Sequence, residues 1–176
     1  AGFTQQRDVE GCWGRQNEIG QTVAGLEAHA ASSKSERLLS LVQRPEPDPD
    51  MLVRNLLRLR HDLVIVGRAA LSPLPAAIAV RLGPFIEPVA ASAGNYLEES
   101  ATALALRRSA PSLAPYQSAL EAYSAEMTML RREGVLQSLS IGDVERTFAL
   151  SFALEQMERS FSDLAHTVEA FSRRKR

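Results

Sequence analysis

One stretch of the 176-residue chain gathers most of the side chains that could bind a charged ligand. It reads Arg-Asn-Leu-Leu-Arg-Leu-Arg-His-Asp over residues 54–62, and one further arginine follows. On a helix, residues three or four positions apart are neighbours, and a guanidinium matches a carboxylate or phosphate in a two-pronged geometry. The candidate anion-binding residues are Arg54, Arg58, Arg60, His61 and Arg68. The alternatives are that these side chains pair with carboxylates on adjacent helices or are solvated.

A second basic cluster ends the chain at Arg173, Arg174, Lys175 and Arg176. Each cation held near an anionic cytoplasmic leaflet gains about 1 kcal/mol, and the cluster obeys the positive-inside preference of membrane proteins. A solvated helix end, which the helix dipole favours, explains the cluster equally well. We treat these residues as candidate membrane-surface contacts.

The sequence predicts no catalytic site, no metal site and no cofactor, so we expect the chain not to be an enzyme. Its single cysteine, Cys12, and its three histidines lack metal-ligand spacing. There is no Gly-x-Ser-x-Gly elbow and no phosphate-binding glycine loop. His61 is not followed by the Lys and Gly typical of histidine phosphotransfer domains, because residues 64–65 are Val and Ile. The carboxylate pairs at 98–99 and at 155 and 158 are interpreted as solvated faces.

Composition narrows the class further. Twenty Lys and Arg against 21 Asp and Glu give a net charge of −1, which argues against a nucleic-acid partner. Residues 63–86 form the most apolar stretch considered, and arginines and prolines interrupt it, so we expect no membrane span there. The chain begins without Met. We therefore expect a soluble piece cut from a longer protein.

The elements that position these residues are predicted to be helices. Apolar residues recur at helical spacing and no segment alternates with a period of two. We predict one all-α domain over residues 1–176, an antiparallel bundle of about five helices. It comprises a long N-terminal helix within 1–42 and a bundle core over 49–174. The core helices are expected at about 51–70, 75–108, 113–134 and 142–172, and a proline-rich loop precedes them at 44–50.

Three expectations concern how these helices pack. The 51–70 helix has the widest apolar stripe, so we expect it to be the most buried. The third helix contains Pro84 and Pro88, so we expect a kink or a break near residues 83–88. The glycines of the first helix either allow close packing against a neighbouring helix or make the helix fray.

Residues 52–70, Leu-Val-Arg-Asn-Leu-Leu-Arg-Leu-Arg-His-Asp-Leu-Val-Ile-Val-Gly-Arg-Ala-Ala, are followed by Pro73-Leu-Pro75. This run resembles the soluble domain of the fusaric acid resistance family of bacterial inner-membrane proteins. Residues 130–134 and 143–156 are similar to downstream helices of that family. The resemblance implies a transporter-like protein with an N-terminal block of membrane helices, in a family associated with export of aromatic carboxylic acids. It assigns no role to the arginines.

Under this resemblance, the chain is expected to be the cytoplasmic domain of an inner-membrane efflux protein. It would act in assembly, gating or partner docking, with its own transmembrane domain as partner, and would form homo-oligomers through the first helix. The alternative is a ligand-sensing bundle that binds an anionic aromatic molecule through the arginine-rich helix.

Overall fold

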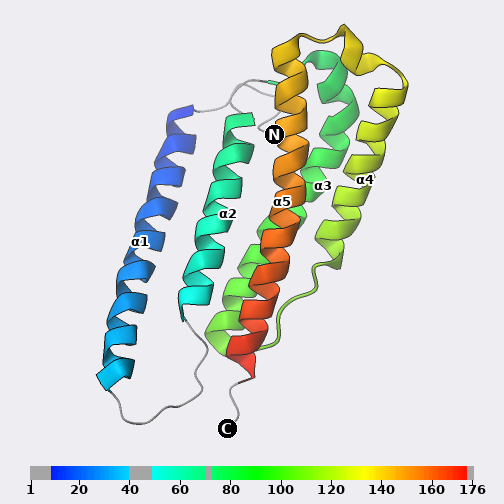
Figure 1. The fold of residues 1–176 in the computed structure, drawn as a ribbon. Helices are drawn as coiled ribbons and strands as arrows, with labels where there is room; N and C mark the ends of the chain where they lie inside the picture. The colour runs from blue at the N-terminus through cyan, green and yellow to red at the C-terminus, as the bar shows by residue number, and fades with distance from the viewer. Residues whose placement is uncertain (1–8, 40–48, 70–72, 174–176) are drawn as a thin grey trace.

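The computed structural model describes residues 9–39, 49–69 and 73–173, apart from the side chains of residues 9–13, 15 and 33–39. These residues form five α-helices and one short 3-10 helix, without a strand, which confirms the predicted all-α bundle. Successive helices run in opposite directions, with α1, α3 and α5 descending and α2 and α4 ascending in Figure 1. The predicted antiparallel arrangement is therefore present.

α5 (Ile141–Ser172) is the central helix of the bundle. It packs against α2 (Pro49–Ala69), α3 (Ala76–Leu106) and α4 (Ala114–Arg132). Ten of its residues are buried, compared with four in α2. The prediction that the 51–70 helix is the most buried is therefore wrong. The apolar stripe of α2 is wide, but α2 packs closely against only α1 and α5. Apolar residues at the margin of the stripe, such as Leu57, therefore stay partly exposed, at 36% for Leu57.

Two tyrosines fix the register of α3 and α4 against α5. Tyr96 donates a 3.0 Å hydrogen bond to the carbonyl of Phe161, and Tyr116 donates one of 2.8 Å to the carbonyl of Leu154. The Phe161 ring packs against both tyrosine rings, with centroid separations of 4.9 and 5.0 Å. Aromatic pairs at this separation add to the stabilisation that burial supplies.

α3 remains one helix from Ala76 to Leu106, so of the kink or break predicted near Pro84 and Pro88, the break does not form. Each proline removes the hydrogen bond to the carbonyl four residues earlier. Both prolines lie on the exposed side of α3, where Val80 is 75% exposed. The freed carbonyls of residues 80 and 84 therefore face the solvent side, where water can satisfy them.

α3 is also the one helix in the described residues that is long and apolar enough to cross a membrane, by length and composition alone. The sequence predicts no membrane span at residues 63–86, and this candidate helix lies partly beyond that range. A single helix of this kind is weak evidence for a span, because core helices of soluble proteins pass the same test. Here α3 packs against α4 and α5.

The ends of α3, α4 and α5 are set by local hydrogen bonds. α3 ends at Arg107, which has a left-handed backbone with φ of 52°, and the amide of Arg108 donates to the carbonyl of Ala103 at 2.8 Å. Gly134, with φ of 73°, ends α4 and leads into the 3-10 helix η1 (Val135–Ser138). The stop predicted at Gly134 is confirmed.

Ser140 caps the start of α5. Its Oγ accepts a 3.2 Å hydrogen bond from the amide of Asp143 and donates a 2.7 Å bond to the Asp143 carboxylate. These interactions, with the ion pair to Arg146, hold the pKa of Asp143 below its ordinary value. The cap satisfies a backbone donor that has no partner within the helix.

α1 (Val9–Leu39) lies at the edge of the bundle, beside α2 (Figure 1). Of its described side chains, only Val23 and Ala30 are buried, while Ile19 and Leu26 are 39% and 40% exposed. Close packing occurs at Gly20, where an added Cβ would lie 3.1 Å from Nη2 of Arg60. Gly14 and Gly25 face open space, so close packing is confirmed at one of these glycines and absent at two.

Candidate functional site

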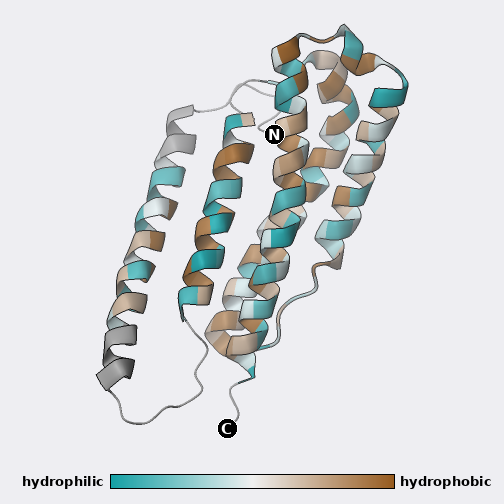
Figure 2. Cartoon of the chain, viewed as in Figure 1, coloured by the Kyte–Doolittle hydropathy of each residue, from teal (hydrophilic) through white to brown (hydrophobic). Residues whose placement is uncertain are grey.

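The seam between α2 and α5 holds the buried polar side chains of α2. Asn55, Leu59 and Asp62 follow the four-three spacing that puts residues on one helix face, and all three are buried against α5. Figure 2 shows hydrophobic and hydrophilic residues alternating along the visible turns of α2 and α5. Polar groups placed on this face must find partners across the seam, because unpaired buried polar atoms are unfavourable.

Asn55 finds its partners on α5. Its Nδ2 donates to the carbonyl of Asp163 at 3.0 Å and to Oγ1 of Thr167 at 2.6 Å. The Thr167 hydroxyl in turn donates to the same Asp163 carbonyl at 3.1 Å. Asn55 is thus part of a closed hydrogen-bond network that joins two helices.

Two further polar residues of α2, Arg58 and Asp62, bond to α5 as well. Nη1 of Arg58 lies 2.8 Å from Oδ2 of Asp163, in a surface ion pair whose side chains are 64% and 45% exposed. One turn further on, Asp62 is 2% exposed and accepts a 2.7 Å hydrogen bond from the hydroxyl of Ser160. The seam therefore contains a buried carboxylate beside a surface ion pair.

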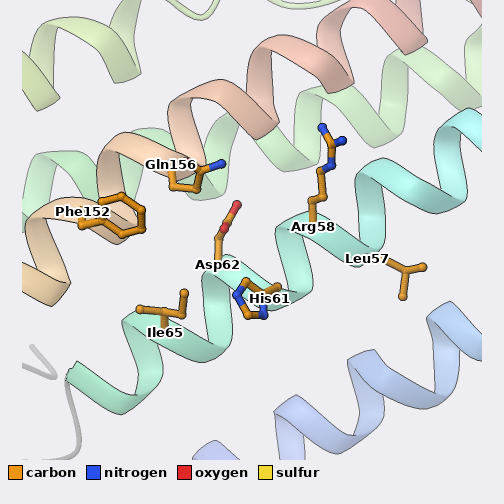
Figure 3. Close-up of a pocket in the computed structure, with 7 residues that line it drawn as sticks. All are labelled: Leu57, Arg58, His61, Asp62, Ile65, Phe152 and Gln156. Carbon is orange, nitrogen blue, oxygen red and sulfur yellow. The ribbon is translucent and has the colours of Figure 1, made fainter.

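A cavity of about 540 Å³ opens along this seam, within the range of 300–1,000 Å³ that is usual for small-molecule sites. Figure 3 shows the side chains around it: three apolar groups, two cationic or titratable groups at the rim, an amide and the buried carboxylate. The lining residues are Leu57, Arg58, His61, Asp62, Ile65, Phe152 and Gln156.

The structure brings together only two of the five predicted anion-binding residues. Arg58 and His61 line the cavity. The guanidinium of Arg60 lies against Gly20 of α1, on another side of α2. Arg54 and Arg68 are exposed and do not line the cavity. The five candidate residues therefore do not form one binding surface, and Arg58 is paired with a carboxylate of α5.

Two residues that matter at the seam were not among the predicted site residues. Asn55 and Asp62 are seven positions apart, at points in the apolar stripe of α2 where hydrophobic residues are expected. Polar residues within a buried stripe were the signal that could have identified them. The hydrogen-bond donor to Asp62 is Ser160, which lies across the seam on α5.

The C-terminal basic cluster is described at one residue. Arg173 is exposed and its Nε lies 3.4 Å from Oε1 of Glu169, one turn earlier on α5. Arg174, Lys175 and Arg176 lie outside the described residues. The membrane-contact prediction for this cluster stays a prediction.

Metal ligands do not cluster in the described part of the chain, where no group of three or more His, Cys, Asp or Glu side chains could hold an ion. The side chain of Cys12 is outside that part. His29, His61 and His166 come from three different helices and are exposed. Glu98, Glu99 and Glu155 are exposed and Glu158 is half-buried.

The groups with shifted pKa values serve packing. Burial raises the pKa of Tyr96, Tyr116 and Tyr123, and for Tyr116 the charges of Glu158 and then Asp62 add to the effect. Hydrogen bonds from Arg81 on α3 hold the pKa of Glu133 below its ordinary value. The same guanidinium bonds Glu126 at 2.5 Å and Glu133 at 2.8 Å, which links α3 to α4.

This arrangement can bind and orient a ligand at the α2–α5 cavity. Catalysis would need an accessible nucleophile beside a base, but the Ser160 hydroxyl next to Asp62 belongs to a residue that is 2% exposed. Comparisons of the chain with protein-family models, with curated proteins and with solved structures find no match.

Proposed function

We propose that this bundle is the cytoplasmic accessory domain of an efflux protein of the fusaric acid resistance type, and that it acts in assembly of the transporter. The resemblance of residues 52–70, 130–134 and 143–156 to that family supports the proposal. The all-α antiparallel architecture is compatible with it. In this role the chain works through its surface and not through catalysis.

The observation that carries the assembly role is the position of α1. This helix of 31 residues packs closely against α2 alone among the described helices, and it leaves Ile19 and Leu26 about 40% exposed. Apolar side chains exposed along one helix are stabilised when a second helix covers them. Ile19 and Leu26 flank the buried Val23 and Ala30 on one helical stripe, and we assign the uncovered edge of this stripe to α1 of a second copy of the chain.

Sedimentation velocity tests the assembly role. We expect the chain to dimerise at high concentration, and the double variant Ile19→Ser, Leu26→Ser to remain monomeric. Val80→Ser is the matched control, because it removes an apolar side chain that is 75% exposed on α3. A chain that is strictly monomeric at high concentration, or a control variant that also loses dimerisation, contradicts a role for α1.

The efflux role needs a separate test on the intact membrane protein that carries this chain. Its expression in a bacterium sensitive to fusaric acid is expected to raise the inhibitory concentration of that acid. The Ile19→Ser, Leu26→Ser variant should lose protection while still fractionating with the inner membrane. Protection that does not differ from that of an empty vector would remove the efflux proposal.

A second candidate function is ligand sensing, and the α2–α5 cavity favours it. The cavity has the volume of a small-molecule site, and both apolar and polar side chains line it. A ligand in this cavity would contact both α2, which carries α1 at the edge of the bundle, and the central helix α5. Because α1 packs against α2, a ligand that moves α2 relative to α5 would also move α1.

A further inference from the structure

The α2–α5 cavity contains a carboxylate whose hydrogen-bonding capacity is only partly used. Asp62 is 2% exposed, and its one hydrogen bond to a described residue comes from the Ser160 hydroxyl at 2.7 Å. No cation within the described part of the chain forms an ion pair with it. A carboxylate offers about four acceptor positions, and burying it with few partners is unfavourable. Figure 3 shows this carboxylate directed from α2 toward α5, near Gln156.

The arginine nearest along α2 does not balance this charge. Nη1 of Arg58 is committed to Asp163 at 2.8 Å, at the surface of the seam. That guanidinium is therefore not bonded to Asp62, whose carboxylate is the one acidic group among the described residues that line the cavity. His61 is exposed at the rim. The cavity therefore favours a ligand that brings a positive charge.

The walls of the cavity favour a ligand with an apolar body. Leu57 and Ile65 come from α2, and Phe152 comes from α5 with 60% of its surface exposed. An exposed phenylalanine beside a cavity gains apolar contact when a ligand covers it, and its ring face attracts cations. Figure 3 places Phe152 and Ile65 on the side of Asp62 away from Arg58.

We infer that the α2–α5 cavity binds a small molecule that joins a protonated amine to an apolar or aromatic body, with the amine donating to Asp62 and the body packing against Phe152. The inference rests on the ligand-sensing candidate above. It reverses the ligand charge expected from the arginine-rich sequence, because the buried group that faces the cavity is an acid.

Calorimetric titration with three probes that share one body tests the inference. The probes are 2-phenylethylamine, 2-phenylethanol and phenylacetate, which at pH 7 carry a positive charge, no charge and a negative charge. Hydrogen bonds to charged groups are worth enough to change affinity by about tenfold or more. We expect the amine to bind the full chain at least about tenfold more tightly than either other probe.

Three variants locate the binding. Asp62→Asn keeps the shape of the side chain and should abolish the preference for the amine over the alcohol. Glu155→Gln removes the same charge from an exposed position of α5 that does not line the cavity, and should leave the preference intact. Phe152→Ala, at an exposed position, should weaken all three probes to a similar extent. Thermal unfolding confirms that each variant is folded.

The possible outcomes distinguish failure of the ligand-sensing candidate from failure of the amine inference. Binding of no probe overturns the ligand-sensing candidate together with the inference. Preferred binding of phenylacetate keeps ligand sensing and overturns the amine. A preference for the amine that survives Asp62→Asn also overturns the inference. If Asp62→Asn does not fold, Phe152→Ala decides: unchanged amine affinity in that variant contradicts the site.

Discussion

Polar residues inside an apolar stripe decide how α2 meets α5. Asn55 donates to both Asp163 and Thr167, so its removal takes one hydrogen-bond donor from each of these acceptors. Asp62 holds the only carboxylate among the buried polar residues of the described chain. At the residue scale, this seam is specified by hydrogen bonding as well as by packing.

Asn55→Ala tests the contribution of that hydrogen bonding. Loss of one buried and one part-buried hydrogen bond should lower the free energy of unfolding by about 1–3 kcal/mol, measured by urea denaturation. Asn95→Ala is the matched control, since Asn95 is exposed on α3, and we expect it to stay within about 0.5 kcal/mol of the parent. An equal effect of both substitutions would contradict the role of the seam network.

Tyr116 gives stability a dependence on alkaline pH. Burial raises its pKa above the ordinary value near 10, so the folded chain retains the phenolic proton when the unfolded chain loses it. The contribution of the protonated Tyr116 to the free energy of unfolding is complete below about pH 10, and it declines as pH rises above that value. The sign follows from a folded pKa higher than the unfolded pKa.

Tyr116→Phe should therefore act in two ways. At pH 7 it should lower the free energy of unfolding by about 0.5–1.5 kcal/mol, because the 2.8 Å bond to the Leu154 carbonyl is lost. Between pH 10 and 11.5 its melting temperature should fall less steeply than that of the parent. Parallel melting curves against pH for the two proteins would contradict this assignment.

The candidate site was only partly predictable from the sequence. Helical spacing placed Arg58 and His61 close together on one helix, and both side chains line the α2–α5 cavity. It could not show that Asp163, 105 positions further along the chain, pairs with Arg58. Nor could it show that Arg60 packs against α1. Such long-range pairings depend on which helices become neighbours, and local periodicity does not specify that.

At the element scale, helix positions were largely predictable because turn residues and apolar periodicity agree. The helix predicted over residues 113–134 forms as α4, and Tyr116, Leu120, Tyr123 and Met127 lie on its buried face. A kink or a break was predicted in α3, and the helix is not broken because both prolines lie on its exposed side, where the lost hydrogen bonds face solvent. The burial of α2 was overestimated because a wide stripe does not show how many neighbours a helix has.

The C-terminus of α3 offers a test of element boundaries. Arg107 has a left-handed backbone, which costs a residue with a side chain about 1–2 kcal/mol relative to glycine. Arg107→Gly should raise the free energy of unfolding by about 0.5–1 kcal/mol, measured by urea denaturation.

Arg108→Gly, at the next exposed position, is the control for that substitution. It should not stabilise the chain, because only Arg107 has a positive φ among the non-glycine residues of the described chain. A stabilising effect of both substitutions would point to a general effect of charge removal.

At the scale of the whole molecule, the basic C-terminal cluster can be tested as a membrane contact. Replacing Arg174, Lys175 and Arg176 with Gln should weaken binding to vesicles of phosphatidylglycerol by about 3 kcal/mol, or roughly a hundredfold. Vesicle co-sedimentation measures this. Arg159→Gln, at an exposed site of α5, should have at most a small effect.

Salt and lipid charge provide the controls for the vesicle experiment. Raising the ionic strength should weaken the binding of the parent chain, because exposed charges are screened. Vesicles of phosphatidylcholine alone should bind neither protein. Binding that is insensitive to salt, or equal for the parent and the triple variant, would contradict the electrostatic contact.

Because the bundle has an odd number of antiparallel α-helices, the first helix begins at one end of the bundle and the last helix ends at the opposite end. Residue 9 at the start of α1 and Arg173 after α5 lie at opposite ends of the bundle in Figure 1. A helix of 32 residues is about 48 Å long, or roughly six Debye lengths in physiological salt. A bundle standing upright on a bilayer can therefore touch it with one end only. If both ends contact the same membrane, the bundle must lie on its side, with its helix axes parallel to the lipid surface.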